Sequence, residues 1–372
     1  MPSLSVVVAP DSFKGSIGAP AAAEALARGW TAERPGDAVR QLPLADGGEG
    51  TLDAFEASVP GAVRHAVEVP GPDDRTVSAS WLMLPGGTAV VELAGASGIT
   101  LLDRPRPYDA HTRGLGRALV AALDGGARRV VVGLGGSGST DGGAGVLTEL
   151  GARLLDSLGE PVADGAHGLA AAVRLDLGAV RSLPPEGVVA LTDVVSPLLG
   201  PRGSAAVFGP QKGAGPDDVL ALESSLASFA CLVDVDPRTP GAGAAGGAGF
   251  GLLLWGAELR SGAAAVAELV GLGAAIDGAD VVVTGEGRYD DQTAEGKVVS
   301  WVGSRARASG VRASLVAGSV AAPTPDFAEV VDLAHLAGGT AEATADATRW
   351  LEEAGGRLAR RETQREEERA SR

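Results

Sequence analysis

Residues 129–143 read Arg-Val-Val-Val-Gly-Leu-Gly-Gly-Ser-Gly-Ser-Thr-Asp-Gly-Gly, and this stretch decides the fold class. Its β-branched beginning, residues 129–133, predicts a short buried strand. The glycine-rich middle predicts a loop, and a helix is expected near residues 146–150. A strand that runs into a glycine-rich loop and then a helix is typical of parallel α/β sheets, in which ligands bind beyond the carboxyl ends of the strands.

The groups in this loop suit phosphate. Main-chain N–H groups can approach an anion closely where glycine removes the side chain, and serine and threonine add hydroxyl donors. The candidate phosphate-binding residues are Gly135, Gly136, Ser137, Ser139, Thr140 and Asp141. Gly133, Gly135 and Gly138 also satisfy G-x-G-x-x-G, with Asp156 and Glu160 about where a ribose-binding acid is expected. A phosphate cradle, a dinucleotide site and a purely structural turn all stay open on this pattern.

The same strand–loop–helix pattern occurs toward both ends of the chain. Short strands are predicted at residues 4–9, 40–44, 188–191, 281–283 and 314–317. Residues 63–69, 77–84 and 88–93 are separated by turns containing Pro and Gly, which predicts a β-meander. We therefore predict an α/β protein with a Rossmann- or flavodoxin-like parallel-sheet domain at residues 1–62 and 252–372. A mixed α/β domain at residues 63–251 is inserted into it.

Other segments are predicted from composition. Residues 217–231 and 340–353 are expected to form helices, and the glycine-rich residues 241–251 a flexible, close-packed hinge. The tail, residues 357–372, carries six Arg and four Glu, which is typical of a solvated or frayed helix end.

Composition excludes several classes of protein. The 372 residues carry a formal charge of −16, which disfavours nucleic acid and anionic membranes as partners. A single cysteine, Cys231, cannot form an internal disulfide and fits a reducing compartment. The N-terminal residues lack the features of a signal peptide, and no apolar run approaches the ~20 residues that span a bilayer. A cytoplasmic protein is therefore expected.

Two loops near the N-terminus carry candidate groups. Residues 9–16 contain Ser12 and Lys14, where the lysine could provide a positive charge for phosphate or carboxylate; a capped turn is the alternative. Residues 46–51 place Asp46 and Glu49 among three glycines. Carboxylates with close backbone approach suit Mg²⁺, although acids in the first turn of a helix are common without a metal.

Two further loops follow later strands. Asp193 comes after the strand at 188–191 and could act as a general base, a metal ligand or only a cap of the next turn, while Lys212 could neutralise a transferring phosphate. Residues 284–293, together with Gly296 and Lys297, contain three acids, an arginine and a lysine in a short span, of which Glu286 and Asp290 are the strongest candidates.

Taken in order, these loops resemble the type I family of bacterial glycerate kinases. The matching blocks are residues 9–16, 43–51, 133–143, 193–198 with 208–214, and 284–297. The sequence departs from the family pattern at Ser196, where Asn is usual, at Ser139-Thr140, where Thr-Asn is commoner, and at Asp291, where Ser is usual. These changes concern substrate contacts more than the reaction class.

The resemblance implies ATP-dependent phosphorylation of D-glycerate to 2-phosphoglycerate with Mg²⁺, in a cleft between two α/β domains. In-line transfer of a phosphoryl group requires mainly positioning and charge neutralisation. We assign catalytic roles to Asp193, Lys14, Lys212 and Asp46, where either Asp193 or Asp46 orients or deprotonates the hydroxyl. Substrate contacts are assigned to Asp11, Ser12, Arg288 and Lys297, and metal binding to Glu49, Glu286 and Asp290.

Two other functions compete with this hypothesis. A nicotinamide-dependent oxidoreductase of a small hydroxy acid would use the glycine pattern in residues 133–138. A non-catalytic sensor would close on a small acid without turnover. The sequence leaves the oligomeric state open.

Overall fold

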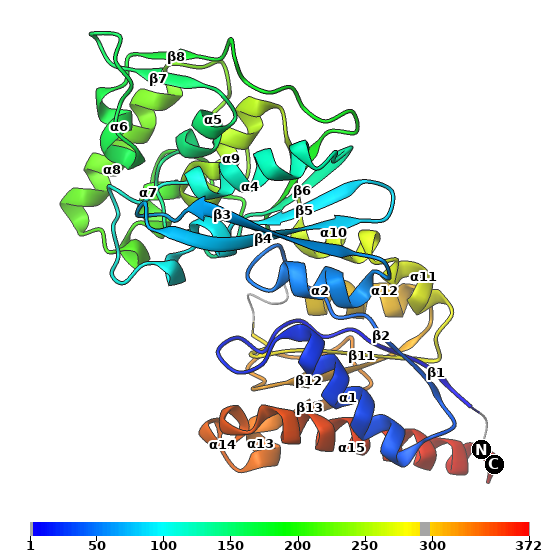
Figure 1. Ribbon diagram of the computed structural model, residues 1–372. Helices are drawn as coiled ribbons and strands as arrows, with labels where there is room; N and C mark the ends of the chain where they lie inside the picture. The colour runs from blue at the N-terminus through cyan, green and yellow to red at the C-terminus, as the bar shows by residue number, and fades with distance from the viewer. Residues whose placement is uncertain (1–2, 291–297, 372) are drawn as a thin grey trace. The chain divides into compact units, whose positions relative to one another are not determined.

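A computed structural model describes residues 3–290 and 298–371 (Figure 1). Its residues group into two compact units. The first comprises residues 1–46, 53–60 and 263–372, and the second comprises residues 47–52 and 61–262. The domain boundaries expected from the sequence, after residues 62 and 251, stay a prediction.

The first unit is built on a parallel sheet with the strand order β13-β12-β11-β1-β2. Its strands are β1 (Ser5–Val8), β2 (Ala38–Gln41), β11 (Val281–Glu286), β12 (Arg312–Ala317) and β13 (Glu329–Asp332). Valines 6–8 of β1 pair with valines 281–283 of β11, and all six are buried. A continuous apolar run of this kind is typical of a central strand covered on both faces.

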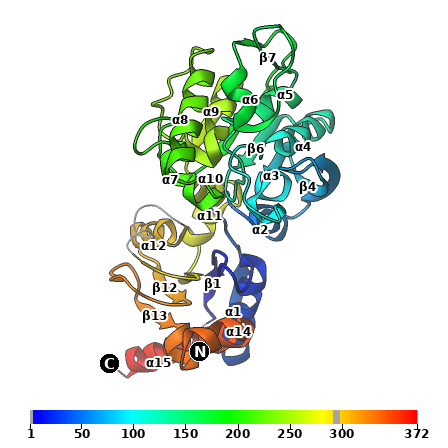
Figure 2. The same cartoon turned by 90° about the vertical axis from the view of Figure 1, so that its left-hand side faces the viewer.

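Helices cover both faces of this sheet (Figures 1 and 2). They are α1 (Ala19–Glu33), α11 (Leu272–Asp277), α12 (Val298–Ala308), α13 (Leu333–Ala337), α14 (Thr340–Ala345) and α15 (Ala347–Ala370). Two more helices, α2 (Thr51–Ser58) and α10 (Gly262–Leu269), begin in residues of the second unit and continue in the first. On one face, Val6 and Val283 share a core with Trp30 of α1 and Leu351 of α15. On the other, Leu315 packs with residues of α12.

The second unit has a mixed sheet with the order β10-β9-β6-β5-β4-β3. Its strands are β3 (Val63–Pro70), β4 (Thr76–Leu84), β5 (Thr88–Glu92), β6 (Arg129–Gly133), β9 (Val188–Leu191) and β10 (Glu258–Arg260), with a separate hairpin of β7 (Arg153–Leu155) and β8 (Arg174–Asp176). Strands β3, β4 and β5 pair antiparallel, whereas β5, β6, β9 and β10 are parallel. The register places the carboxyl ends of the four parallel strands in one row, at Glu92, Gly133, Leu191 and Arg260.

Helices pack on this sheet around one large core. They are α3 (Ala94–Ser97), α4 (Arg113–Asp124), α5 (Ala144–Glu149), α6 (Gly165–Ala171), α7 (Ser204–Phe208), α8 (Pro216–Ala230) and α9 (Ala244–Trp255), with 3₁₀ turns at Ile99–Leu101 and Pro210–Lys212. Val130 and Val132 of β6 face Leu119 of α4, and Phe229 of α8 meets Phe250 of α9 edge to face.

The structure confirms the α/β class, the parallel sheet and the β-meander. Strands β6 and β9 occupy the residues predicted for them. The strand predicted at 40–44 is wrong in position, because β2 pairs with β1 over residues 38–41.

The prediction of a flexible, close-packed hinge at residues 241–251 is wrong about the hinge and right about the close packing. Most of this segment belongs to α9 and is buried. Its glycines permit close packing: a Cβ on Gly251 would lie 2.8 Å from the Cα of Gly143. Ala245, Gly246 and Gly247 have positive φ, so the chain turns sharply inside this helical segment.

The C-terminal tail is helical as far as Ala370, but only part of it is solvated. Leu358 and Glu362 are buried, and Arg365 pairs with both Glu362 and Glu329 of β13. The residues 340–353 are not one helix either, because Asp346 separates α14 from α15 and accepts a hydrogen bond from Arg349 N–H as the N-cap of α15.

We predict that Gly29→Ala destabilises the first unit. Helices α1 and α15 cross so closely that a Cβ on Gly29 would overlap the carbonyl oxygen of Glu352. The helices would have to separate, which costs on the order of 1–3 kcal/mol of unfolding free energy. Denaturant unfolding followed by circular dichroism measures this. Gly36→Ala is the control, since no atom lies within 4 Å of its Cβ position; equal stability of the two variants would contradict the prediction.

Candidate active site

The glycine-rich loop after β6 lies at the row of carboxyl ends in the second unit. Residues 47 and 48 press against its beginning: Gly135 N–H donates to the carbonyl oxygen of Gly47 at 3.0 Å, and a Cβ on Gly133 would lie 2.5 Å from that oxygen. Side chains at 133 and 135 would therefore separate the two segments. Residues 47–48 and 133–135 are thus in direct contact.

Asp141 is the centre of this loop. Its carboxylate is completely buried and accepts hydrogen bonds from Thr112 N–H (2.8 Å), Thr112 Oγ–H (2.7 Å), Gly143 N–H (3.1 Å) and Gly145 N–H (3.2 Å). No described residue forms an ion pair with it. The carboxylate of Asp141 thus occupies the donors at the start of α5, where an anion would otherwise bind, and joins the loop to α4.

Lys212 contacts the same loop. The side chain is buried, and its ammonium group donates to the carbonyl oxygen of Ser139 and, at 3.4 Å, to Ser137 Oγ. Burial lowers the pKa of Lys212 to about 8, against an opposing effect of the Asp141 carboxylate. The site therefore holds a cation whose described hydrogen-bond partners are neutral groups.

Three hydroxyl groups accompany Lys212. Ser137 Oγ lies 3.3 Å from Ser139 Oγ and donates to the carbonyl oxygen of Ala245 at 3.1 Å. Thr140 Oγ1 is buried, and no described residue makes a hydrogen bond with it. A buried hydroxyl without a partner is costly, so a polar ligand or water at this position would be favourable.

Glu92, the last residue of β5, was not among the predicted site residues. Its buried carboxylate accepts hydrogen bonds from Gly50 N–H (3.3 Å) and Leu52 N–H (3.1 Å) at the start of α2. Glu92 therefore fixes the segment that carries Glu49. The available signal was an acid at the end of a predicted strand.

Asp193 lies beyond the carboxyl end of β9, two residues after Leu191. Its Oδ1 accepts hydrogen bonds from Ser261 Oγ–H (2.8 Å) and Gly262 N–H (2.9 Å), so this carboxylate caps the start of α10. Capping was one of the roles that the sequence left open for it.

In the first unit, Asp11 and Asp46 lie together beyond β1 and β2. Asp11 N–H donates to the carbonyl oxygen of Gly285 at 2.8 Å, which places it beside the end of β11. Burial, and after it the charge of Asp46, raise the pKa of Asp11 to about 7, while the N–H of Ser12 and the charge of Lys14 act in the opposite direction. Lys14 is largely exposed, with its Nζ 3.8 Å from Asp46 Oδ2.

The remaining predicted residues of the first unit follow β11. Glu286 ends that strand and is buried, and its charge, together with burial, raises the pKa of Tyr289. Arg288 pairs with Asp290 at 3.2 Å. Lys297 and Asp291 lie outside the described residues. The predicted residues are thus divided between the units: Asp11, Ser12, Lys14, Asp46, Glu286, Arg288 and Asp290 belong to the first, and Glu49, the 135–141 loop, Asp193 and Lys212 to the second.

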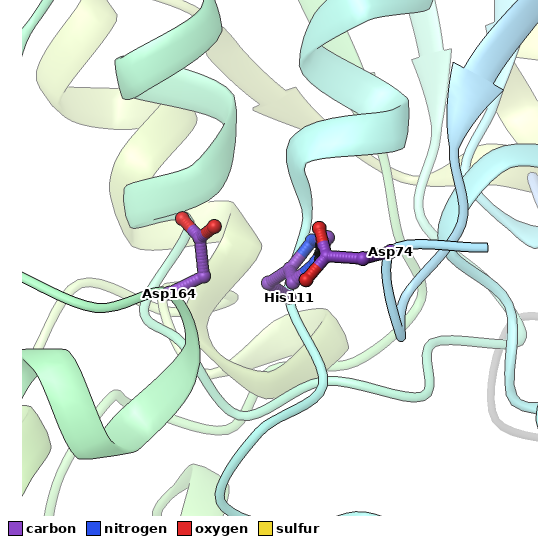
Figure 3. A group of neighbouring side chains, drawn as sticks. All are labelled: Asp74, His111 and Asp164. Carbon is purple, nitrogen blue, oxygen red and sulfur yellow. Dashed lines mark hydrogen bonds and ion pairs between the residues drawn. The ribbon is translucent and has the colours of Figure 1, made fainter. Parts of the chain in front are cut away.

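The predicted metal ligands do not form a cluster among the described residues. The group that does is Asp74, His111 and Asp164, whose ligand atoms lie within 4.8 Å of one another (Figure 3). Arg113 supplies the positive charge there: its guanidinium lies 3.1 Å from Asp164 and 3.9 Å from Asp74. This group is therefore an ion-pair cluster around the start of α4.

A buried cation and a glycine-rich loop at the carboxyl ends of the parallel strands of a mixed sheet are typical of an α/β enzyme suited to phosphate chemistry. The model of the "Glycerate kinase family" matches residues 6–362. The chain belongs to the glycerate kinase family, a family of kinases.

Named relatives support the assignment to this family. The chain is 41% identical over 327 residues to a "Glycerate kinase" of Bacillus subtilis, covering 85% of each chain, and 39% identical over 305 residues to the "Glycerate 2-kinase" of Escherichia coli, covering 79% of this chain and 80% of the relative. A crystal structure described as glycerate kinase 2 from Salmonella typhimurium superposes with a TM-score of 0.87 at 32% identity, over 98% of this chain and 100% of the other. No described helix is both long and apolar enough to cross a membrane.

We predict that Asp11→Asn stabilises the protein in a pH-dependent manner. The folded state raises the pKa of Asp11 from its ordinary value of 3.8 to about 7, so it binds more protons than the unfolded state between those values. Stability from this group is therefore present below pH ~4 and lost as the pH rises through ~7. After allowance for solvent screening, Asp11→Asn should be more stable than the wild type at pH 8 by on the order of 1–2 kcal/mol, and equal to it near pH 4.

Urea unfolding at the two pH values measures the difference. Glu367→Gln, at an exposed position on α15, is the control and should behave alike at both. A stability gain for Asp11→Asn that does not depend on pH would contradict the argument.

Proposed function

We propose that this chain transfers the γ-phosphoryl group of ATP to a hydroxyl of D-glycerate and releases 2-phosphoglycerate. The observation that carries the proposal is the loop of residues 134–143. Two buried charged groups, the Asp141 carboxylate and the Lys212 ammonium, hold its main chain in place. Membership of the glycerate kinase family supports the choice of acceptor.

The loop offers main-chain donors to phosphate. No described residue accepts a hydrogen bond from Thr140 N–H or Asp141 N–H. The carbonyl group of Ser139 points to Lys212, and in a trans peptide the following N–H points the opposite way. Thr140 N–H is therefore directed away from Lys212, so this donor faces the ligand while the ammonium adds positive charge from behind.

The acceptor acid would be held by the first unit. Lys14 and Arg288 provide positive charge for the glycerate carboxylate, and Ser12 provides a hydroxyl. Asp11, with its pKa raised to about 7, can donate or accept a hydrogen bond near neutral pH. We propose that Asp46 takes the proton of the attacking hydroxyl, because the carboxylate of Asp193 is used as a helix cap.

Magnesium, when bound, would neutralise charge on the phosphates. Carboxylate oxygens are the hard donors that this ion prefers. Glu49, Glu286 and Asp290 stay the proposed ligands, and Glu92 would fix the segment that carries Glu49.

The structure disfavours the nicotinamide-dependent alternative. A dinucleotide site needs the N-terminus of the following helix for the pyrophosphate, but α5 has only six residues and its first donors bind Asp141. Asp156, the candidate ribose ligand, accepts hydrogen bonds from Leu158 N–H and Glu160 N–H in its own turn.

The proposal is tested by ADP release measured with D-glycerate, L-glycerate or no acid, each with and without Mg²⁺. ADP release that requires D-glycerate and Mg²⁺, with 2-phosphoglycerate identified by NMR, supports it. Binding of D-glycerate without turnover would support a sensor instead, and 3-phosphoglycerate would overturn the assigned product.

We predict different effects for two carboxylates. Asp46→Asn should lower kcat/KM at least ~10²-fold through loss of the base. Asp193→Asn should stay within about threefold of the wild type, because the amide retains the oxygen that accepts from Ser261 and Gly262. Steady-state kinetics distinguishes the two variants. A larger loss of kcat/KM in Asp193→Asn than in Asp46→Asn would assign the role of the base to Asp193.

We also predict that Lys14→Ala lowers kcat/KM at least ~10²-fold through lost charge stabilisation. Arg238→Ala is the matched control, since it removes one exposed positive charge that pairs only locally with Asp236. Comparable losses in both variants would indicate a general effect of net charge and contradict a site role for Lys14.

A further inference from the structure

Thr112 lies directly before α4, in a segment that carries none of the predicted site residues. The side chain is completely buried. Its N–H and Oγ–H both donate to Asp141 Oδ2, at 2.8 and 2.7 Å, and its Oγ1 accepts from Val146 N–H of α5 at 3.0 Å. One hydroxyl therefore connects the glycine-rich loop to the helix that follows it.

Close packing holds Thr112 in this position. A Cβ on Gly145 would lie 2.9 Å from the Thr112 nitrogen, and one on Gly116 would lie 2.9 Å from the Cα of Val146. The absence of side chains at these glycines lets α4 and α5 approach each other at the loop. Thr112 therefore contacts the start of α5 directly and the loop through the carboxylate of Asp141.

The flanking residues anchor Thr112 from the other side. Arg113 donates from Nε to Glu149 Oε1 at 2.9 Å and pairs with Asp164, and His111 Nε2 lies 3.2 Å from Asp74 Oδ1 (Figure 3). The main chain around Thr112 is thus fixed by the ion-pair cluster on one side and by Asp141 on the other.

The charge of Asp141 makes the hydroxyl of Thr112 important. The carboxylate is buried, no described cation pairs with it, and Thr112 Oγ–H makes the shortest of its four hydrogen bonds. Hydrogen bonds to a charged group are stronger than those between neutral groups, and a buried charge that loses a donor has no water to replace it. Asp141 would then reorient toward other donors, and the N–H groups of residues 140 and 141 would move with it.

We propose that Thr112 is a positioning residue for the nucleotide's phosphates. It touches no substrate; it holds Asp141, and through Asp141 it holds the main-chain donors of residues 140 and 141 in the orientation that binds phosphate. The inference rests on the proposed function, because it assumes that the phosphates of ATP occupy this loop.

The test compares Thr112→Val, which has the same shape without the hydroxyl, with Thr112→Ser, which keeps the hydroxyl. We expect Thr112→Val to raise KM for ATP at least ~10-fold and to change KM for D-glycerate less than about threefold. Thr112→Ser should restore KM for ATP to within about threefold of the wild type. Thr148→Val is the matched control: this threonine is exposed on α5, and its hydroxyl bonds only within the helix.

A general loss of stability would lower the active fraction and with it the apparent kcat, whereas KM of the folded enzyme would not change, so a selective increase in KM for ATP separates positioning from folding. Wild-type kinetics in Thr112→Val, or a Thr112→Ser variant as impaired as Thr112→Val, would overturn the proposal. If Thr112→Val does not fold, Thr112→Cys replaces the hydroxyl by a weaker donor; we then expect a smaller increase in KM for ATP alone, and no increase would overturn the proposal.

Affinity for ATP measured by calorimetry keeps the two hypotheses distinguishable. If the wild type binds ATP but does not phosphorylate D-glycerate, the proposed function fails, and the Thr112 variants still test positioning through their affinity for ATP. If Thr112→Val binds ATP as the wild type does while the wild type phosphorylates D-glycerate, only the positioning role fails.

Discussion

A buried carboxylate has to be surrounded by donors, and in the second unit this requirement shapes the loop after β6. Asp141 obtains its donors from the start of α4 and from the start of α5, so both helices and the loop are fixed by one charge. The carboxylate uses the donors at the starts of both helices, and no described residue accepts a hydrogen bond from the buried N–H groups of residues 140 and 141. Lys212 completes the arrangement by holding the carbonyl group of Ser139.

Local hydrogen-bond donors also account for how a chain with a formal charge of −16 could bind two anions. The overall field opposes phosphate and carboxylate, so local donors have to exceed it. In the second unit they are main-chain amides backed by a buried ammonium, which water screens little. In the first unit the proposed groups are the exposed side chains of Lys14 and Arg288, and Lys14 acts on Asp11, whose raised pKa reduces its negative charge.

Much of this architecture follows from local sequence. Short β-branched runs indicated β6, β9 and β11, and glycine-rich loops follow the first and the last of them. Parallel pairing then brings the strand ends at Glu92, Gly133 and Leu191 together. The roles of Thr112 and Glu92 could not be predicted, because their partners lie 29 or more residues away and become neighbours only after folding. At residues 241–251 the glycines correctly indicated close packing but not the helix α9, because the contact between Gly251 and Gly143 forms only after folding.

Hydrogen–deuterium exchange across residues 134–145 tests the central claim most directly, because it reports on the main-chain donors themselves. No described residue accepts a hydrogen bond from the amides of residues 140 and 141, so in the free protein they should exchange faster than the amide of Gly142, which donates to the carbonyl oxygen of Gly246. A non-hydrolysable ATP analogue with Mg²⁺ should slow their exchange at least ~10-fold. Tight binding of the analogue with unchanged exchange in this loop, and protection elsewhere, would contradict the account.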